Sequence, residues 1–165
     1  MAKTIKAQKL TPEAFAKYGT YNDLLNPGDW PKLGDDDSDV KFFRDMALGS
    51  FQPAGSIAFS NTQVKKRPLE ISVIEKHNNT CEGMLVLDNT SLVFLGAATP
   101  EGEYPYNDLD VFIVPKGVFL IVRPGVWHHA PFVMEADIAN TLIVLPEYTY
   151  VNDCDVYEVP KGEWP

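Results

Sequence analysis

The sequence predicts a single all-β domain, either a sandwich or a closed barrel, preceded by one short helix. From residue 40 onward the chain consists of short runs of β-branched and aromatic residues separated by turn residues. No helical periodicity of useful length follows residue 20. Many short strands at near-regular spacing favour an architecture in which closure or a second sheet protects the strand edges.

The helix is expected close to the N-terminus. Thr11 can cap it, Pro12 suits its first position, and Gly19 can end it. Residues 20–39 are expected to be irregular, because Asn-Pro-Gly and aspartate-rich turn sequences dominate there. Residues 35–46 lack the glycine and the closing glutamate of a calcium loop, so we interpret the acidic run as a solvated loop.

Strands are expected in the rest of the chain. Residues 88–90 and 115–117 are turn sequences short enough to join their neighbours as hairpins. No linker or repeat divides the chain, which predicts one domain over residues 1–165. The expected strands lie near residues 40–43, 56–59, 69–75, 83–87, 91–95, 111–114, 118–122, 138–145 and 156–159.

Composition narrows the functional class. The 165 residues are 45% hydrophobic and 22% charged, as in an ordinary globular protein. A net charge of −9 argues against a basic nucleic-acid face or an electrostatic membrane contact, but leaves room for a small anionic substrate. No apolar run could span a bilayer, and no signal peptide is evident. Cys81 and Cys154 are interpreted as free thiols, so we expect a cytoplasmic protein.

The candidate chemistry lies at the histidines, of which the chain has three. His77 ends one expected strand and Glu82 opens the next, while a Pro-Gly turn precedes His128. Adjacent antiparallel strands could bring these side chains to the mouth of a barrel. Two imidazoles and a carboxylate there could hold a divalent ion such as Ni, Mn, Fe or Zn. The alternative is a half-buried structural histidine pair and an ordinary exposed carboxylate.

The spacing of His77 and Glu82, together with the Pro-Gly turn before His128, resembles the two motifs of cupin barrels. This fold is also described as a double-stranded β-helix or jelly roll. In cupins a histidine and a glutamate five residues later point into the barrel as metal ligands, and a Pro/Gly turn precedes a further histidine. The resemblance implies that His77, Glu82 and His128 bind the metal. It also places Glu75, two residues before His77 on the same face, where cupins carry their first histidine.

Longer stretches are similar to the ureidoglycolate lyase family. The resemblance rests on residues 65–69, 74–77 and 125–129, and extends to 10–19 and 153–159. It implies a cupin-type barrel, generally a homodimer, that releases glyoxylate and urea from ureidoglycolate in allantoin degradation, a branch of purine catabolism.

The sequence also departs from this family in places. Lys76 replaces the usual arginine, and Cys81-Glu82 stands where the family usually has Ser-Gln. Residues 107–115 are more β-like than the family's helical segment. These departures bear on the substrate and leave the fold assignment intact.

The resemblance suggests roles for the neighbouring residues. Cleavage of ureidoglycolate needs a proton removed from the hydroxyl and a proton delivered to the leaving nitrogen. Glu75 or His129 could provide this acid–base catalysis. Trp127 could wall the pocket, although core packing is the ordinary role of such a residue. The substrate carboxylate could be bound by three basic residues, which could instead form a solvated strand edge: Lys65, Lys66 and Arg67.

Two other functions remain open at this point. One is a metal-dependent cupin isomerase or epimerase acting on a sugar. The other is a non-catalytic cupin that binds a small metabolite.

Overall fold

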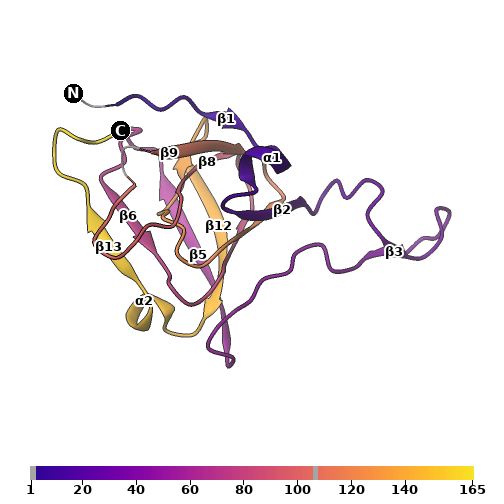
Figure 1. Ribbon diagram of the computed structural model, residues 1–165. Helices are drawn as coiled ribbons and strands as arrows, with labels where there is room; N and C mark the ends of the chain where they lie inside the picture. The colour runs from indigo at the N-terminus through magenta and orange to yellow at the C-terminus, as the bar shows by residue number, and fades with distance from the viewer. Residues whose placement is uncertain (1–2, 106–107) are drawn as a thin grey trace.

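The structure, a computed structural model, describes residues 3–105 and 108–165. Two sheets face each other in a barrel, which confirms the predicted all-β, cupin-like jelly roll with a short N-terminal helix (Figure 1). The elements are β1 (Gln8–Lys9), α1 (Pro12–Phe15), β2 (Gly19–Asp23), β3 (Lys32–Leu33), β4 (Phe42–Phe43), β5 (Ile57–Lys65), β6 (Val73–Lys76), β7 (Glu82–Val86), β8 (Ser91–Gly96), β9 (Leu109–Val114), β10 (Val118–Val122), β11 (Phe132–Val133), β12 (Ile138–Pro146), α2 (Thr149–Asn152) and β13 (Asp155–Glu158).

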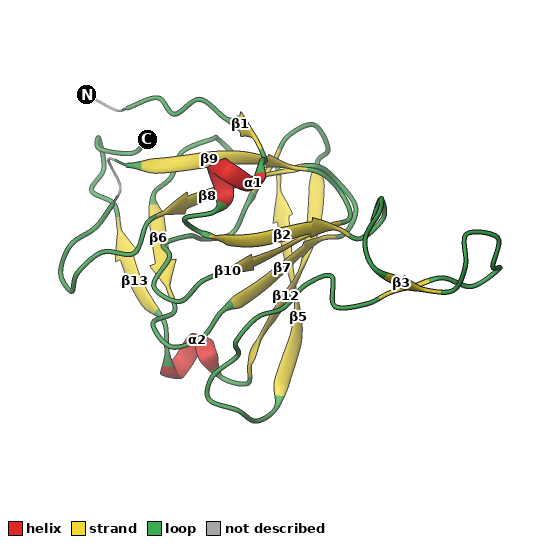
Figure 2. Ribbon diagram, turned by 45° about the vertical axis from the view of Figure 1, so that its right-hand side comes forward, coloured by secondary structure: helices red, strands yellow, loops and turns green. Residues whose placement is uncertain are grey.

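The strands form two main sheets and two short ribbons. One main sheet has the order β2-β10-β7-β12-β5, and the other has the order β1-β9-β8-β11. The ribbon of β6 and β13 is tied to β8 through residues 127–128, because Glu75 pairs with His128 and Gly96 pairs with Trp127 (Figure 2). This connection brings β6 beside the segment that carries His128.

The main hydrophobic core fills the space between the two sheets. Alternate residues of each strand point inward, as the period of a β-strand requires. A second cluster packs around Trp127 on the outer side of the four-stranded sheet. The interior core contains Phe15, Tyr18, Met84, Val86, Val93, Leu95, Phe112, Val114, Val118, Leu120, Val122, Val126 and Ile143.

Helix α1 begins where the sequence predicts but is shorter than expected. The Thr11 hydroxyl accepts a hydrogen bond from the Ala14 amide at 3.2 Å, which caps the helix. The helix ends at Phe15 because the chain must reach β2, which starts at Gly19 and pairs with β10. No helix in the described part of the chain is long and apolar enough to cross a membrane.

Both predicted hairpins are wrong. Strands β7 and β8 flank residues 88–90 but belong to different sheets, and the same holds for β9 and β10 around residues 115–117. Each turn therefore carries the chain across the barrel, as jelly-roll topology requires. The polar strand β2 lies within residues expected to be irregular, because its pairing with β10 outweighs its local composition.

A long arm, residues 24–56, extends away from the barrel (Figure 1). It contains the ribbon of β3 and β4, so the strand expected near residues 40–43 lies outside the barrel. The arm returns to the barrel near the candidate site. There the Ser50 carbonyl accepts a hydrogen bond from the Cys81 amide at 3.0 Å.

Replacing Phe15 should destabilise the barrel, because its ring is 1% exposed in the interior core. Phe15→Ala should lower the free energy of unfolding by about 3–5 kcal/mol. Glu13→Ala, at an exposed position of the same helix, should change it by no more than about 0.5 kcal/mol. Chemical denaturation measures both, and equal unfolding free energies for the two variants would contradict the packing described.

Candidate metal centre

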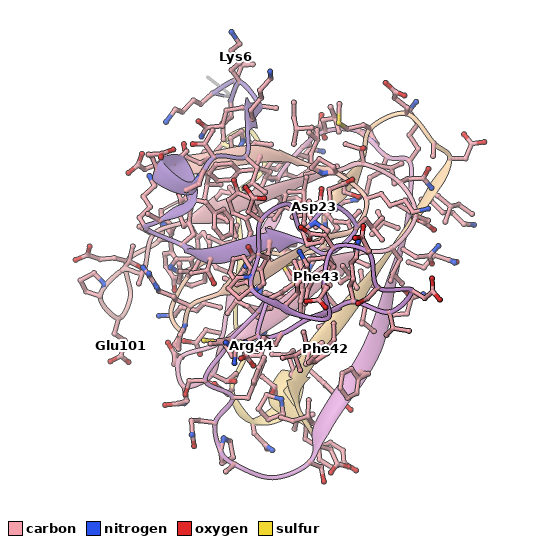
Figure 3. The ribbon with its side chains drawn as sticks, turned by 90° about the vertical axis from the view of Figure 1, so that its right-hand side faces the viewer. Lys6, Asp23, Phe42, Phe43, Arg44 and Glu101 are labelled. Atoms are coloured by element: carbon pink, nitrogen blue, oxygen red, sulfur yellow. The ribbon has the colours of Figure 1, made fainter. Side chains whose placement is uncertain are left out.

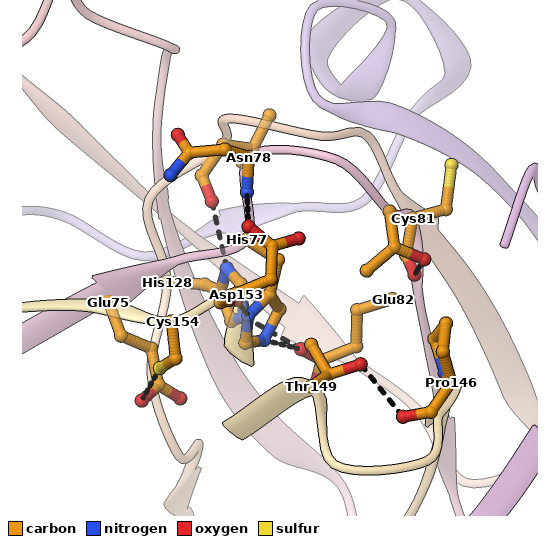
Figure 4. Close-up of polar contacts among 12 residues, drawn as sticks. Glu75, His77, Asn78, Cys81, Glu82, His128, Pro146, Thr149, Asp153 and Cys154 are labelled. Atoms are coloured by element: carbon orange, nitrogen blue, oxygen red, sulfur yellow. Dashed lines mark hydrogen bonds and ion pairs between the residues drawn. The ribbon is translucent and has the colours of Figure 1, made fainter. Parts of the chain in front are cut away.

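Three side chains, two from residues 77–82 and one from His128, meet inside the barrel (Figure 4). His77 Nε2 lies 3.0 Å from Glu82 Oε2, and His128 Nε2 lies 2.8 Å from the same oxygen. The residues His77, Glu82 and His128 are 4%, 5% and 2% exposed. The three residues that the sequence suggests as metal ligands are therefore adjacent and shielded from bulk water.

Strand periodicity directs Glu82 inward. Glu82 is the first residue of β7, and Met84 and Val86 on the same face belong to the interior core. The carboxylate therefore continues the row of inward side chains, at the end of the barrel where β7 begins.

The second face of the cluster is made by the pairing of Glu75 with His128. The Glu75 amide donates to the His128 carbonyl at 2.6 Å, and the His128 amide donates to the Glu75 carbonyl at 2.8 Å. Directly opposed residues of an antiparallel pair place their side chains on the same face. Glu75 is thus held beside His128, and His77 follows two residues later on that face.

Backbone carbonyls fix the outer nitrogens of both imidazole rings. His77 Nδ1 lies 2.6 Å from the Asp153 carbonyl, and His128 Nδ1 lies 2.9 Å from the Val126 carbonyl. A carbonyl oxygen only accepts hydrogen bonds, so both Nδ1 atoms carry the proton. In a neutral ring the Nε2 atom then presents its lone pair to the Glu82 carboxylate.

Two lone pairs aimed at a carboxylate oxygen require a positive charge between them. A proton on an imidazole can provide this positive charge. Burial lowers the pKa of His128, but the charge and hydrogen bond of Glu82 outweigh burial and raise that pKa to about 9. The two histidines likewise overcome the effect of burial and lower the pKa of Glu82 to about 2. A divalent cation would satisfy the same three groups with both rings neutral.

The residues fit a divalent ion. Each of the three residues offers one ligand atom, and these atoms all lie within 4.8 Å of one another. Nitrogen and carboxylate ligands suit several first-row metals, and three protein ligands leave coordination positions for a substrate.

His129 lies at the edge of this cluster and is partly exposed. Burial lowers the pKa of His129, as does the charge of His128, while the charge of Glu75 opposes the shift. The lowered pKa favours a neutral imidazole near Glu75, which is compatible with the acid–base role suggested by the sequence.

Trp127 does not join the cluster. It precedes His128 in an extended segment and therefore faces the other side. Its indole nitrogen donates to the Thr99 hydroxyl at 2.8 Å, and Lys76 Nζ lies 4.9 Å from the ring centroid. These contacts are packing contacts on the outer side of the sheet, and the substrate-binding role suggested for Trp127 stays a prediction.

One of the basic residues suggested as carboxylate ligands, Lys65, lies far from the cluster. Val144 of β12 pairs with Gly83 of β7 on one side and with Phe59 of β5 on the other, so Phe59 lies level with the end of β7 that carries the cluster. Lys65 is six residues further along β5, which places it about 20 Å from that level. Lys66 follows it and is exposed.

Arg67 makes two structural contacts, and its suggested role in substrate binding stays a prediction. Its guanidinium donates to the Ala130 carbonyl at 3.0 Å and lies 4.0 Å from the Phe132 ring centroid. These contacts hold the segment that follows His129.

Two neighbours of the cluster were missed by sequence reasoning. Asp153 supplies the carbonyl that fixes His77, and Cys154 donates its thiol to Glu75 Oε2 at 3.6 Å. Burial and the charge of Glu75 raise the pKa of the Cys154 thiol to about 12, so this cysteine is a hydrogen-bond donor rather than a nucleophile. Residues 153–155 contribute to the resemblance to the ureidoglycolate lyase family, but their sequence does not indicate these contacts.

A jelly-roll barrel with two imidazoles and a carboxylate directed at one point is a cupin-type protein with a candidate metal centre. The family model described as ureidoglycolate lyase matches residues 2–164. The chain therefore belongs to the ureidoglycolate lyase family.

Two solved structures of sugar-nucleotide proteins show a distant similarity. A dTDP sugar isomerase from Desulfovibrio desulfuricans G20 is 15% identical over 81% of this chain and 82% of that chain, with a TM-score of 0.49. RmlC from Streptococcus suis, in complex with dTDP-D-xylose, is 16% identical over 89% of this chain and 72% of that chain, with a TM-score of 0.43. Similarity at this level says nothing about the substrate of this chain. No curated protein matches it.

Removing the charge of Glu82 should weaken metal binding. Glu82→Gln keeps the volume of the side chain but replaces the anionic ligand, so the metal content of the purified protein should fall at least tenfold, the order of loss expected when a ligand or its support is removed. Glu70→Gln is the matched control, because Glu70 is exposed and lies before β6, and this variant should retain its metal. Elemental analysis measures both. Unchanged metal content in Glu82→Gln would remove this residue from the ligand set.

Proposed function

We propose that the protein is a metal-dependent lyase that cleaves ureidoglycolate, or a close α-hydroxy acid derivative, to glyoxylate and urea. Family membership supports the lyase class. The observation that carries the metal-dependent part is the convergence of His77 Nε2 and His128 Nε2 on Glu82 Oε2. Two alternatives are a sugar isomerase or epimerase and a non-catalytic binding protein. Assays of turnover distinguish both from the lyase.

In this proposal His77, Glu82 and His128 hold a divalent ion such as Ni, Mn, Fe or Zn. When bound, such an ion polarises the substrate hydroxyl and anchors the substrate carboxylate. Lys65 lies about 20 Å along β5 from the level of the cluster, so it is too far away to bind the substrate carboxylate there. The carbonyls that hold both Nδ1 atoms keep the Nε2 atoms pointing at this position.

Glu75 is positioned to move the proton that the reaction requires. Its half-buried carboxylate lies beside His128 and is held by the Cys154 thiol. Glu75 accepts the proton of the substrate hydroxyl, the carbon–oxygen double bond of glyoxylate forms, and the carbon–nitrogen bond breaks. The urea nitrogen leaves with the bonding electron pair and takes from Glu75 the proton that Glu75 accepted from the hydroxyl, which returns Glu75 to its carboxylate form. Such acid–base catalysis is typically worth about 10²–10⁴-fold in rate.

Replacing Glu75 should reduce turnover without removing the metal. Glyoxylate release from ureidoglycolate should be measured on protein of known metal content. We expect kcat of Glu75→Gln to fall by about 10²–10⁴-fold. Glu70→Gln, at an exposed position before β6, should match the unaltered protein.

The unaltered protein also distinguishes the competing functions. Absence of glyoxylate release with turnover of a sugar nucleotide would contradict the lyase in favour of an isomerase or epimerase. Ligand binding without turnover would contradict it in favour of a binding protein.

The proposal also assigns the protein to a homodimer, for which the arm provides the argument. On the arm, Val40, Phe42 and Leu48 are 77%, 60% and 73% exposed. Figure 3 looks onto the arm, with Phe42, Phe43 and Arg44 on it in front of the barrel. Exposed apolar side chains on an extended segment are typical of a surface that is covered by a partner.

Charge favours a second copy as that partner. Residues 24–56 contain six aspartates and three basic residues. Residues 57–67 contain three basic residues and no acidic one, and they form the edge strand β5 and its continuation. In a two-fold dimer the acidic arm of each copy would lie on the basic edge of the other, so the same contact would form twice.

Polar substitution on the arm should therefore dissociate the dimer. Val40→Ser combined with Phe42→Ser should shift the mass measured by sedimentation from two chains to one. Val156→Ser removes an apolar side chain that is similarly exposed but lies in β13, and it should leave the mass unchanged. An unaltered protein that sediments as a single chain at micromolar concentration would refute the dimer.

We also assign the protein to the cytoplasm. Both cysteines, Cys81 and Cys154, are free thiols. Reducing compartments keep thiols in this state, whereas secreted proteins tend to form disulfides.

A further inference from the structure

Asp153 connects the C-terminal part of the chain to the metal centre. It lies between α2 and β13, and its amide donates to the Thr149 carbonyl at 2.8 Å. Its carboxylate accepts from the backbone amides of Asn78 and Asn79, both at 2.9 Å. Its carbonyl accepts from His77 Nδ1 at 2.6 Å (Figure 4). One residue therefore bonds both to the imidazole of His77 and to the two residues that follow it.

These contacts form a closed hydrogen-bonded unit. The carboxylate holds Asp153 against the turn after His77, and the carbonyl of the same residue is only a few covalent bonds away. Bonds from amides to an ionised carboxylate are stronger than neutral ones. The carboxylate therefore determines where the carbonyl lies relative to the His77 ring.

The two imidazoles differ in how they are held. His128 Nδ1 bonds the carbonyl of Val126, two residues earlier in the same segment. His77 Nδ1 bonds a residue 76 positions away in sequence. The orientation of His77 thus depends on a long-range contact that a side-chain substitution can disturb.

We propose that Asp153 is a positioning residue that uses its carboxylate to fix its own carbonyl, and so holds His77 Nε2 toward the metal position. This inference rests on the proposed metal-dependent function. Outer partners of a metal-binding histidine set its tautomer and ring orientation, and their loss typically weakens metal binding about 10–100-fold.

The test is the affinity for Zn²⁺ alone, measured by competition with a chelator. Asp153→Ala removes all three carboxylate bonds, of which the third comes from the side-chain amide of Asn79 at 3.1 Å, and should weaken zinc binding about 10–100-fold. Asp153→Asn keeps one acceptor oxygen, so its affinity should lie between those of Asp153→Ala and the unaltered protein. Asn78 and Asn79 are exposed, so water can replace the carboxylate at their amides and the variants should fold.

Asp155→Asn is the matched control. Asp155 accepts from the side-chain amide of Asn78 at 2.8 Å and lies 3.8 Å from Lys76 Nζ, but it makes no bond to His77. Zinc binding by this variant should equal that of the unaltered protein. Equal affinities for Asp153→Ala and the unaltered protein would overturn the inference, and so would an equal loss in Asp155→Asn. If Asp153→Ala does not fold, Asp153→Asn decides by the same comparison.

A second readout separates this inference from the proposed function. In metal-free protein, ¹⁵N-edited NMR of the imidazoles reports the Nδ1 proton of each ring. The His77 proton should exchange faster in Asp153→Ala, while the His128 proton should not change. If the unaltered protein binds none of Zn²⁺, Ni²⁺, Mn²⁺ and Fe²⁺, the proposed metal dependence fails, and the NMR result alone decides on Asp153. An unchanged His77 proton would then overturn its positioning role.

Discussion

The chemistry of this protein depends on two imidazole nitrogens directed at one carboxylate oxygen inside a barrel. His77 Nε2 and His128 Nε2 lie 3.0 and 2.8 Å from Glu82 Oε2, and all three side chains are buried. Both Nδ1 atoms donate their protons in hydrogen bonds to backbone carbonyls, so each Nε2 atom of a neutral ring presents a lone pair to the carboxylate. Only an added positive charge can then relieve the repulsion between these lone pairs and the carboxylate oxygen. Burial strengthens this requirement, since water cannot screen the mismatch.

The fold supplies this convergence by ordinary strand geometry. Alternation along β7 turns Glu82 inward at the end of a row of core residues, and the pairing of Glu75 with His128 brings two distant segments onto one face. Asp153 adds a contact from the far end of the chain. The cluster is thus fixed from three directions before any ligand binds, which is the preorganisation that a metal centre requires.

The sequence revealed the three residues of the cluster better than their surroundings. His77, Glu82 and His128 could be found because motif spacing and strand ends are local signals, and alternation next to His128 could also have shown that Trp127 faces outward. The distance between Lys65 and the cluster could not be predicted, because it depends on how β5 and β7 are aligned through their pairing with β12. Asp153 could not be found either, since its contact with His77 is made by a backbone carbonyl, which every residue type possesses. The two turns misjudged as hairpins failed for a related reason, since whether a short turn stays in one sheet or crosses to the other depends on the whole barrel.

The most direct test of the proposed metal centre is a crystal structure of the protein as purified, with anomalous diffraction recorded at the absorption edges of Mn, Fe, Ni and Zn. We predict one anomalous peak about 2.0–2.2 Å from His77 Nε2, His128 Nε2 and a carboxylate oxygen of Glu82. A map without such a peak, from protein that elemental analysis shows to be free of metal even after incubation with these ions, would contradict the account.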